Sequence, residues 1–394
     1  MNAKRVMRQF VILSILNSAF MGLTSATYVT FLAHYGLDLF EQGVVNFCCF
    51  LMLTIMEIPT GVIADMYGRK ISYLISCSLA SVGLLLYGLS TTMFGFIAAE
   101  MVLAIGITFS SGAFRAWFVD RFHHFKHQES LSTVFARASG FGVVASVVAA
   151  IIGAHLYKLS PAAPWFAGAV MSLVAGIVAC SCKEEYFVRE SSTVTFKIQI
   201  LKTAFADFRK SISHDGPFRF IVVVSFALHM FVAAPNMQWQ PFFGFYLQNE
   251  IWLGYVYFGI KIAVFAGTCL APIVLRHIVC EKKSIMTTQL VIAVSLFVAA
   301  LCDSFWLAGA AFLIHEMGRG AVTPIADAYL HGNIEARQRA TIDSCASMVY
   351  RGAGAIGLLF GGFIAKRFGI PFTWMIMSVI LATATIAVAL KGKK

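Results

Sequence analysis

Charged residues are scarce in this chain, and their scarcity excludes most soluble classes of protein. Only 12% of the 394 residues are charged and 59% are hydrophobic, whereas soluble domains carry roughly 25% charge. The apolar runs are continuous and do not alternate with polar residues. This pattern indicates membrane-spanning helices, because spanning strands would alternate.

Catalytic and cofactor motifs are also missing. The nine cysteines form no paired CxxC motifs with companion histidines, so they predict neither a zinc site nor disulfides. The sequence contains no nucleophile–base arrangement, no metal-ligand spacing and no phosphate-binding loop. We therefore expect a protein that is not an enzyme and that holds no metal or other cofactor. We also expect that ATP does not drive its activity.

Twelve apolar runs are long enough to cross a bilayer, since a core of ~30 Å needs about 20 helical residues. They occupy residues 10–33, 41–64, 71–90, 93–118, 134–157, 164–182, 218–247, 253–276, 285–302, 305–330, 341–364 and 370–390. The longest polar stretch between them divides the runs six and six. We predict an all-α membrane protein with an N-terminal six-helix bundle (1–182), a cytoplasmic linker (183–216) and a C-terminal six-helix bundle (217–394).

The formal net charge of +11 could indicate a nucleic-acid partner, but its distribution argues against one. If the N-terminus is cytoplasmic, the inner segments hold 22 of the 30 lysines and arginines. The outer segments hold three, Lys158, Lys366 and Arg367. This positive-inside bias predicts a multi-pass protein of a bacterial cytoplasmic (inner) membrane with both termini cytoplasmic.

The linker contains a predicted amphipathic helix, "FKIQILKTAFADFRKSI". Phe196, Ile200, Ala204, Phe208 and Ile212 recur at helical spacing, with basic residues between them. Two alternatives remain open. The helix lies flat on the anionic inner leaflet, or it is an ordinary solvated linker helix.

The two halves show a faint internal repeat at an offset of 208 residues. Thr133 corresponds to Thr341, and Gly153 corresponds to Gly361. The matches fall in spans 4–5 and 10–11, which occupy the same positions in each half. Such duplication of six spans is typical of parallel-repeat transporters.

Polar residues gather on every third span. A charge inside a membrane costs at least ~2.5–3.5 kcal/mol, so it should face a cavity or a partner. Spans 3, 6, 9 and 12 carry no charged residue or histidine and are expected to be peripheral. Spans 1, 4, 7 and 10 carry polar stripes, which indicate a shared central pathway; one stripe alone could be helix–helix packing.

The candidate site residues lie on these stripes and on spans 2, 8 and 11. We expect substrate contacts from Asn17, Tyr28, His229, Asn236, Gln240, Lys261, Arg319 and Arg351, and proton coupling at Glu57, Glu100 or Glu316. Buried carboxyl groups can exchange a proton near neutral pH. Two structural alternatives stand beside these roles: Glu316 forms an ion pair with Arg319 or Arg351, and Glu57 is a packed residue beside Pro59.

The C-terminal half also contains a cluster with an excess of positive charge. Among His229, Lys261, His315, Glu316, Arg319 and Arg351, three full charges are positive and one is negative. This excess suggests an anionic or zwitterionic substrate. In span 7, Pro235 and Pro241 flank "NMQWQ" and predict either a gate or a structural kink. Trp239 either stacks on the substrate or anchors the helix at the interface.

Residues 61–70, "GVIADMYGRK", place charge among glycines at the end of span 2. A carboxylate at the C-terminal end of its own helix opposes the helix dipole, so Asp65 should meet another helix's N-terminus or a basic side chain. Gly61 and Gly68 permit close approach and a tight turn. A topogenic loop would explain Arg69 and Lys70 alone, whereas a conformational latch explains all of these residues.

Gly61, Ala64, Asp65, Gly68, Arg69 and Lys70 resemble the loop between the second and third helices of the major facilitator superfamily. The twelve spans, the two halves and the middle linker extend this resemblance over the whole chain. "EIPTGVIAD", "SSGAFRAW" and "RATIDS" are similar to bacterial drug-efflux-like members, of the drug:proton antiporter type. The resemblance implies that Asp65 meets the start of span 11 near Thr341–Ser344 and that Arg69 pairs with Asp120.

Three features depart from the family pattern. Arg115 lies near the cytoplasmic end of span 4, where proton-coupled members often carry a central arginine. Span 5, "GFGVVASVVAAIIG", lacks the proline of antiporters. The second half's counterpart of the loop motif, "LRHIVCEKK", is degraded. Proton antiport is therefore an expectation from the resemblance only.

The sequence favours a secondary active transporter that works by alternating access and moves a small organic solute. We expect proton-coupled export of a drug-like compound, an anionic metabolite or a siderophore by a monomer in the lipid bilayer, with H+ as coupling ion. The alternative is an ion-coupled importer of an organic anion or nutrient. A non-transporting membrane receptor or scaffold is a third class, but the longest loop, of about 34 residues, offers little for a partner to bind.

Overall fold

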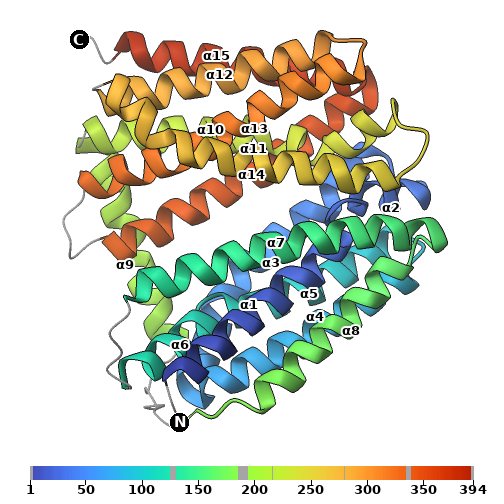
Figure 1. The fold of residues 1–394 in the computed structure, drawn as a ribbon. Helices are drawn as coiled ribbons and strands as arrows, with labels where there is room; N and C mark the ends of the chain where they lie inside the picture. The colour runs from blue at the N-terminus through green and yellow to red at the C-terminus, as the bar shows by residue number, and fades with distance from the viewer. Residues whose placement is uncertain are drawn as a thin grey trace. The chain divides into compact units, whose positions relative to one another are not determined.

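The computed structural model describes residues 3–124, 130–184, 194–214, 216–278, 280–333 and 339–391, and the regular structure in these ranges is helical (Figure 1). The first half contains α1 (Ala3–Ser25), α2 (Tyr28–His34), α3 (Leu39–Tyr67), α4 (Arg69–Leu89), α5 (Met93–Ser111), α6 (Ala113–His124), α7 (Leu131–Leu159) and α8 (Ala163–Cys180). After α9 (Val194–His214), the second half contains α10 (Gly216–Gly244), α11 (Ile251–His277), α12 (Glu281–Leu301), α13 (Phe305–Gly332), α14 (Arg339–Phe368) and α15 (Ile370–Lys391).

Eleven segments of the described chain are long and apolar enough to cross a membrane. Helix α13 has the length of a span but stands outside these eleven, and it carries Glu316, Arg319 and Asp327. With α13 counted as the tenth span, the eleven other segments complete a twelve-helix membrane architecture. The fold class predicted from the sequence is confirmed.

Two predicted spans are each divided into two helices. The span expected over 10–33 is broken at Thr27, between α1 and α2. Just before the break, the hydroxyls of Thr24 and Ser25 both donate to the carbonyl oxygen of Met21, at 3.3 and 2.8 Å. Such bonds to the preceding turn compete with the helical ladder and bend helices. The span expected over 93–118 is divided at Gly112, between α5 and α6.

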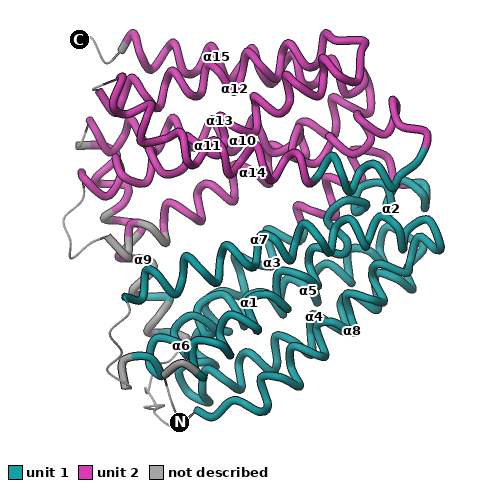
Figure 2. Tube along the Cα trace, in the orientation of Figure 1, with its two compact units in different colours: residues 1–36, 48–199, 249–257 teal, residues 37–47, 200–248, 258–394 magenta. Residues whose placement is uncertain are grey.

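The chain divides into two compact units (Figure 2). Unit 1 comprises residues 1–36, 48–199 and 249–257, and unit 2 comprises residues 37–47, 200–248 and 258–394. The start of α3 therefore belongs to unit 2, where a Cβ on Gly43 would lie 2.9 Å from the carbonyl oxygen of Leu358. The start of α11 belongs to unit 1, where a Cβ on Gly254 would lie 3.0 Å from Cα of Ile151. A division of the sequence at 183–216 does not anticipate these exchanges.

The same helix pairings recur in the two units. In unit 1, α1 packs on α7, and α4 packs on α5 and α8. In unit 2, α10 packs on α14, and α12 packs on α13 and α15. The glycine that repeats in the sequence permits the same close helix contact in both units. A Cβ on Gly153 would meet Leu23 of α1, and a Cβ on Gly361 would meet Ala234 of α10. The faint sequence repeat thus corresponds to a repeated packing scheme.

The helices at the uncharged spans present apolar side chains outward. Val82 on α4, Ile177 on α8, Val294 on α12 and Val379 on α15 are 47%, 70%, 58% and 53% exposed. In a membrane, such faces contact lipid, since lipid tails are as apolar as these side chains. The polar residues of the neighbouring helices can therefore lie in the interior of each unit, away from lipid.

The linker helix α9 packs its second half on unit 2. Phe208 is buried against Phe218 of α10, with ring centroids 5.3 Å apart, and Phe205 and Ile212 join the same cluster. The exposed basic side chains are Lys202, Arg209 and Lys210. The apolar face of this half therefore contacts protein, which leaves it unavailable for insertion into the inner leaflet. The side chains of Phe196, Ile200 and Ala204 lie outside the described residues.

The close approach of α11 and α13 yields a first prediction. A Cβ on Gly320 would lie 2.0 Å from the carbonyl oxygen of Val264, so Gly320→Val must push the two helices apart. Overpacking of this kind typically costs about 1–3 kcal/mol. We expect a clear fall in the thermal unfolding temperature of the purified protein in detergent.

Gly309 supplies the control for this measurement. It lies on the same helix, and nothing lies within 4 Å of a Cβ built on it. Gly309→Val should therefore leave the unfolding temperature nearly unchanged. Equal behaviour of the two variants would contradict the close packing of α11 and α13.

Candidate functional site

Glu100 lies in the middle of α5 and is only 7% exposed. Its carboxylate accepts a hydrogen bond from the Tyr87 hydroxyl of α4 and also contacts the Cys49 thiol of α3. The Tyr28 hydroxyl of α2 lies 3.3 Å from that of Tyr87. A short polar chain therefore runs from Tyr28 through Tyr87 to Glu100, and we call these three residues the Glu100 chain.

Aromatic packing fixes the centre of the Glu100 chain. The Tyr87 ring stacks on Trp165 with centroids 4.1 Å apart and planes inclined by 10°. Trp165 also lies 6.0 Å from the Tyr28 ring and 5.0 Å from Phe31. Because the Tyr87 ring is held on its face, its hydroxyl oxygen is held beside the carboxylate. In the described part of the chain, no basic side chain pairs with Glu100.

Glu316 is a buried carboxylate in unit 2, and its environment differs from that of Glu100. It is 2% exposed on α13, and Arg319 donates to both of its carboxylate oxygens, at 2.9 and 2.7 Å. The Arg319 side chain is 34% exposed. Both bonds come from Nη1 of Arg319, and hydrogen bonds between charged groups are stronger than those between neutral groups. The ion pair weighed as a structural alternative for Glu316 is therefore formed with Arg319.

His315 lies beside this pair and is fully buried. Its Nδ1 lies 3.0 Å from the carbonyl oxygen of Ile292, a contact that requires the proton on Nδ1. Its Nε2 has no hydrogen-bond partner among the described residues and lies 4.0 Å from Oε1 of Glu316. A second proton on this ring would therefore face the Glu316 carboxylate.

Helix α10 places several predicted substrate residues in unit 2. His229 stacks on Tyr350 of α14 with ring centroids 4.9 Å apart, and its Nδ1 lies 2.8 Å from the carbonyl oxygen of Ser225. The Oδ1 atom of Asn236 is buried without a hydrogen-bond partner among the residues described. Gln240 is buried as well. The helix continues through both of its prolines, and Trp239 is 6% exposed.

The other predicted residues lie on separate helices. Asn17 of α1 accepts a hydrogen bond from the Tyr73 hydroxyl at 2.8 Å, which uses its side-chain oxygen. Lys261 on α11, Arg351 on α14 and Glu57 on α3 are half-buried. The Glu100 chain and the Glu316–Arg319 pair thus each gather their own set of neighbours within one unit.

The loop motif at the start of α4 is held from two sides in unit 1. The Arg69 guanidinium forms an ion pair with Asp120 of α6. The Glu184 carboxylate, just beyond α8, accepts the backbone N–H groups of Arg69 and Lys70 at 2.7 and 3.0 Å. Gly68 adopts φ +110°, and a Cβ there would lie 2.8 Å from Oε2 of Glu184. Glu184 therefore satisfies the first N–H groups of α4, which have no partner within the helix.

The contact expected for Asp65 falls on an incompletely described segment. The side chains of Thr341, Asp343 and Ser344 lie outside the described residues. Asp65 itself is half-buried near the end of α3. Lys70 donates from Nζ to the carbonyl oxygen of Cys180 at 3.0 Å, which ties α4 to α8.

The opposite end of α3 is capped by Asp38. Its Oδ1 accepts the backbone N–H groups of Phe40 and Glu41, both at 2.9 Å, and its Oδ2 lies 2.6 Å from Nζ of Lys366. Slight burial acts to raise the pKa of Asp38, but the hydrogen bonds from Lys366 and the two N–H groups outweigh it and lower the pKa below 3.8. A lowered pKa means that these contacts stabilise the fold above pH ~4 and are lost as the pH falls below it.

Three residues of this geometry were absent from the sequence-based candidates: Tyr87, Glu184 and Asp38. Tyr87 gave no signal because a tyrosine in an apolar helix is ordinary. Glu184 follows a span directly, and its partners lie 115 and 114 residues away. Asp38 could have been found, because Asp at position 38 and Glu at position 41 form the spacing of a capping box, and the backbone N–H of Asp38 donates to Glu41 at 2.9 Å.

These features define a multi-pass helical membrane protein that repeats one six-helix packing scheme and buries a carboxylate in each copy. A comparison with models of protein families agrees with this architecture. The model of the Major Facilitator Superfamily matches residues 10–286. The chain therefore belongs to the Major Facilitator Superfamily.

Solved structures similar to this chain are transporters. The nucleoside transporter NupG superposes with a TM-score of 0.81 at 16% identity, covering 98% of this chain and 99% of that one. A bacterial homolog of the human lysosomal transporter Spinster gives 0.77 at 12% identity, covering 99% and 97%. A POT family transporter in complex with a thioalcohol-conjugated peptide gives 0.74 at 11% identity, covering 99% and 96%. A comparison with curated protein sequences finds no match.

The Glu184 cap leads to the second prediction. Glu184→Ala removes Oε1, the atom that accepts both N–H groups at the start of α4, and losing a cap typically costs about 0.5–2 kcal/mol. We expect a lower thermal unfolding temperature and faster hydrogen exchange at the amides of Arg69 and Lys70. Gly68→Ala should act in the same direction through its positive φ.

Gly112→Ala is the matched control, because nothing lies within 4 Å of a Cβ at Gly112. It should leave the exchange at Arg69 and Lys70 unchanged. Unaltered exchange at these two amides in Glu184→Ala would show that Glu184 does not cap α4.

Proposed function

We propose that this protein is a proton-coupled secondary active transporter that moves a small organic solute across the membrane by alternating access. Membership of the Major Facilitator Superfamily supports transport as the activity. The drug-efflux-like sequence motifs favour export of a drug-like compound, an anionic metabolite or a siderophore, with H+ as the coupling ion.

Proton coupling is carried by one observation, the contrast between the two buried carboxylates. Protonation of Glu316 would remove its ion pair with Arg319, which donates to both of its oxygens. Protonation of Glu100 breaks no ion pair in the described part of the chain, and the Tyr87 hydroxyl can turn to accept from the carboxyl group. We therefore assign the coupling proton to Glu100 in preference to Glu316 or Glu57.

The charge of the substrate is inferred from the basic residues of unit 2. Lys261, Arg319 and Arg351 carry three positive charges, and the Glu316 carboxylate neutralises Arg319. The count for this set is therefore +2, which favours an anionic or zwitterionic solute. Asn236, Gln240 and His229 are proposed to orient it by hydrogen bonding, with Asn17 and Tyr28 contributing from unit 1.

The second candidate function is ion-coupled uptake of an organic anion or nutrient. The fold similarity to NupG and to a peptide-bound POT family transporter puts nucleosides and short peptides among the solutes to be tested. Both candidates share the coupling site and differ in direction.

Accumulation in energised membrane vesicles tests the proposal. Right-side-out and inverted vesicles are incubated with a panel of organic acids, siderophores, cationic drugs, nucleosides and dipeptides, with and without a proton uncoupler. We expect uncoupler-sensitive accumulation of at least one acidic or zwitterionic solute in inverted vesicles. Accumulation in right-side-out vesicles alone would favour uptake, and uncoupler-resistant transport would rule out proton coupling.

The third prediction separates the two carboxylates. Glu100→Gln keeps the size of the side chain and cannot exchange a proton, so pH-driven accumulation should fall at least tenfold while substrate exchange at equal pH persists. Glu316→Gln should instead lower the thermal unfolding temperature, because Arg319 loses its charged partner. Both variants are compared in proteoliposomes and by thermal unfolding.

Matched pH dependence in Glu100→Gln and the unmodified protein would overturn the assignment. A strong loss of unfolding temperature in Glu100→Gln with normal transport would make Glu100 a structural residue. Tyr87→Phe serves as the intermediate variant, since it removes only the hydrogen-bond donor.

The fourth prediction concerns the loop motif, which we propose to be a conformational latch formed by Gly61, Asp65, Gly68, Arg69, Lys70 and Asp120. Asp65 is proposed to interact with the N–H groups at the start of α14, an anion-favouring position worth about 0.3–2 kcal/mol. Asp65→Asn should slow turnover strongly and change substrate affinity little, as measured by transport kinetics and cysteine labelling. Loss of affinity with unchanged labelling would place Asp65 in the binding site.

A further inference from the structure

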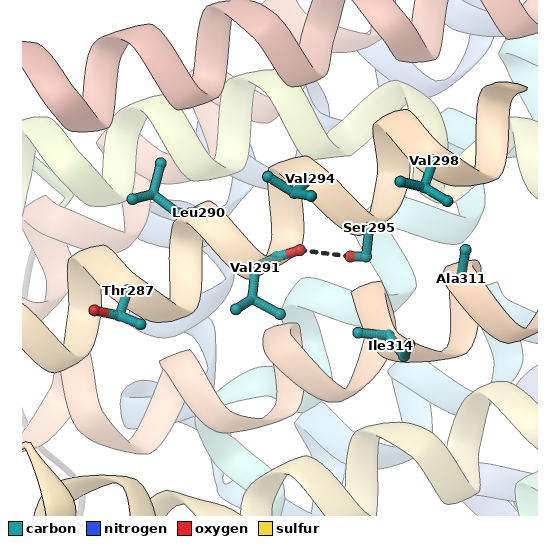
Figure 3. Close-up of a pocket in the computed structure, with 8 residues that line it drawn as sticks. All are labelled: Thr287, Leu290, Val291, Val294, Ser295, Val298, Ala311 and Ile314. Carbon is teal, nitrogen blue, oxygen red and sulfur yellow. Dashed lines mark hydrogen bonds between the residues drawn. The ribbon is translucent and has the colours of Figure 1, made fainter.

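A groove of about 440 Å³ lies between α12 and α13 in unit 2 (Figure 3). Its lining residues are Thr287, Leu290, Val291, Val294, Ser295, Val298, Ala311 and Ile314. Only two of these side chains are polar, and the hydroxyl of Ser295 donates to the carbonyl oxygen of Val291 at 2.6 Å. The groove therefore offers an apolar surface with its inner hydroxyl already satisfied.

The groove opens on the outward face of two helices of a membrane protein. Val294, Val298 and Ile314 are 58%, 43% and 49% exposed. An apolar surface at this position contacts lipid tails in the bilayer. The groove is thus available to a lipid acyl chain, and none of its lining residues is charged.

The length of the groove matches one leaflet. Along α12 it extends from Thr287 to Val298, as Figure 3 shows. Eleven residues at ~1.5 Å each give about 16 Å, and half of a hydrocarbon core of ~30 Å is about 15 Å. One acyl chain of one leaflet therefore fits the groove from end to end.

A basic residue lies near the end of the groove that Thr287 forms. Lys283 is exposed and lies one turn before Thr287, so the two share a face of α12 with Val291 and Val294. Lys282 turns elsewhere, with Nζ 5.5 Å from the Phe220 ring. Glu281 is exposed too, but at about 100° per residue it lies well away from the face of Lys283.

We propose that this groove binds one anionic phospholipid, with an acyl chain along α12 and α13 and the headgroup phosphate on Lys283 and Thr287. The largely apolar groove takes the chain, and the positive charge at its end selects the phosphate. The positive-inside bias places this end of α12 at the cytoplasmic leaflet, which is rich in anionic lipid. The proposal does not depend on the direction or coupling of transport.

The bound lipid would stabilise the contact between α12 and α13, across which His315 bonds to Ile292. The Ile292 carbonyl that accepts from His315 lies on α12, one residue from Val291. A Cβ on Gly318 would lie 2.6 Å from Cγ1 of Ile292, so the two helices are already in close contact. A chain in the groove covers this contact from the lipid side.

Lipid retention tests the proposal. The full-length protein is purified in detergent, exposed to phosphatidylglycerol or phosphatidylcholine with identical acyl chains, and examined by native mass spectrometry. We expect one phosphatidylglycerol molecule to be retained with at least fivefold preference, the scale expected for one basic residue near a charged surface. Equal retention of the two lipids would mean annular lipid only and would overturn the proposal.

Variants locate the site. Lys283→Gln should remove the preference for phosphatidylglycerol, and Val294→Trp should fill the groove and reduce retention of both lipids. Lys282→Gln and Val379→Trp are the matched controls, on a lysine off the groove face and on an exposed valine of α15, and both should retain the lipid. If Val294→Trp fails to fold, Lys283→Gln against Lys282→Gln decides alone; equal loss in these two would indicate nonspecific charge attraction and contradict the site.

Discussion

The structure depends on one constraint: a charge inside the bilayer must have a partner. Each charged group in the spans is costly by at least ~2.5 kcal/mol when isolated. The two buried carboxylates meet this constraint in different ways. Glu316 is neutralised by Arg319 within one helix turn, and Glu100 is held by a tyrosine that stacks on Trp165. We propose that the first arrangement keeps Glu316 charged and that the second lets Glu100 take up a proton.

The same constraint shapes the helices around these groups. Helix α13 carries the ion pair and lies outside the set of segments apolar enough to be recognised as spans, while α4, α8, α12 and α15 present apolar faces outward. The break at Thr27 begins a new helix at Tyr28, which brings that hydroxyl to Tyr87. Packing between the helices then relies on glycines, and α11 and α13 approach closely because Gly267 and Gly320 lack side chains.

Much of the fold could be predicted from the sequence, because continuous apolar runs and the distribution of lysine and arginine directly reflect the bilayer. The six-plus-six repeat was visible through Gly153 and Gly361, whose packing roles are equivalent. The exchange of helix starts between the units was not predictable, since it depends on contacts between distant segments. Within the site, Glu100 was a candidate because it is a charge in apolar surroundings, and an ion pair of Glu316 was an alternative with Arg319 or Arg351 as partner; the structure shows Arg319. Tyr87 and Glu184 did not, because their partners are set by tertiary packing.

The central claim is that Glu100 carries an exchangeable proton. Infrared difference spectroscopy of the protein in lipid, recorded between acidic and alkaline buffer, reports the C=O stretch of protonated carboxyl groups directly. The account predicts a carboxyl band that titrates with pH, shifts in Tyr87→Phe and disappears in Glu100→Gln, while Glu316→Gln leaves it in place. A band that persists in Glu100→Gln and disappears in Glu316→Gln would contradict the account and move the coupling proton to the ion pair of α13.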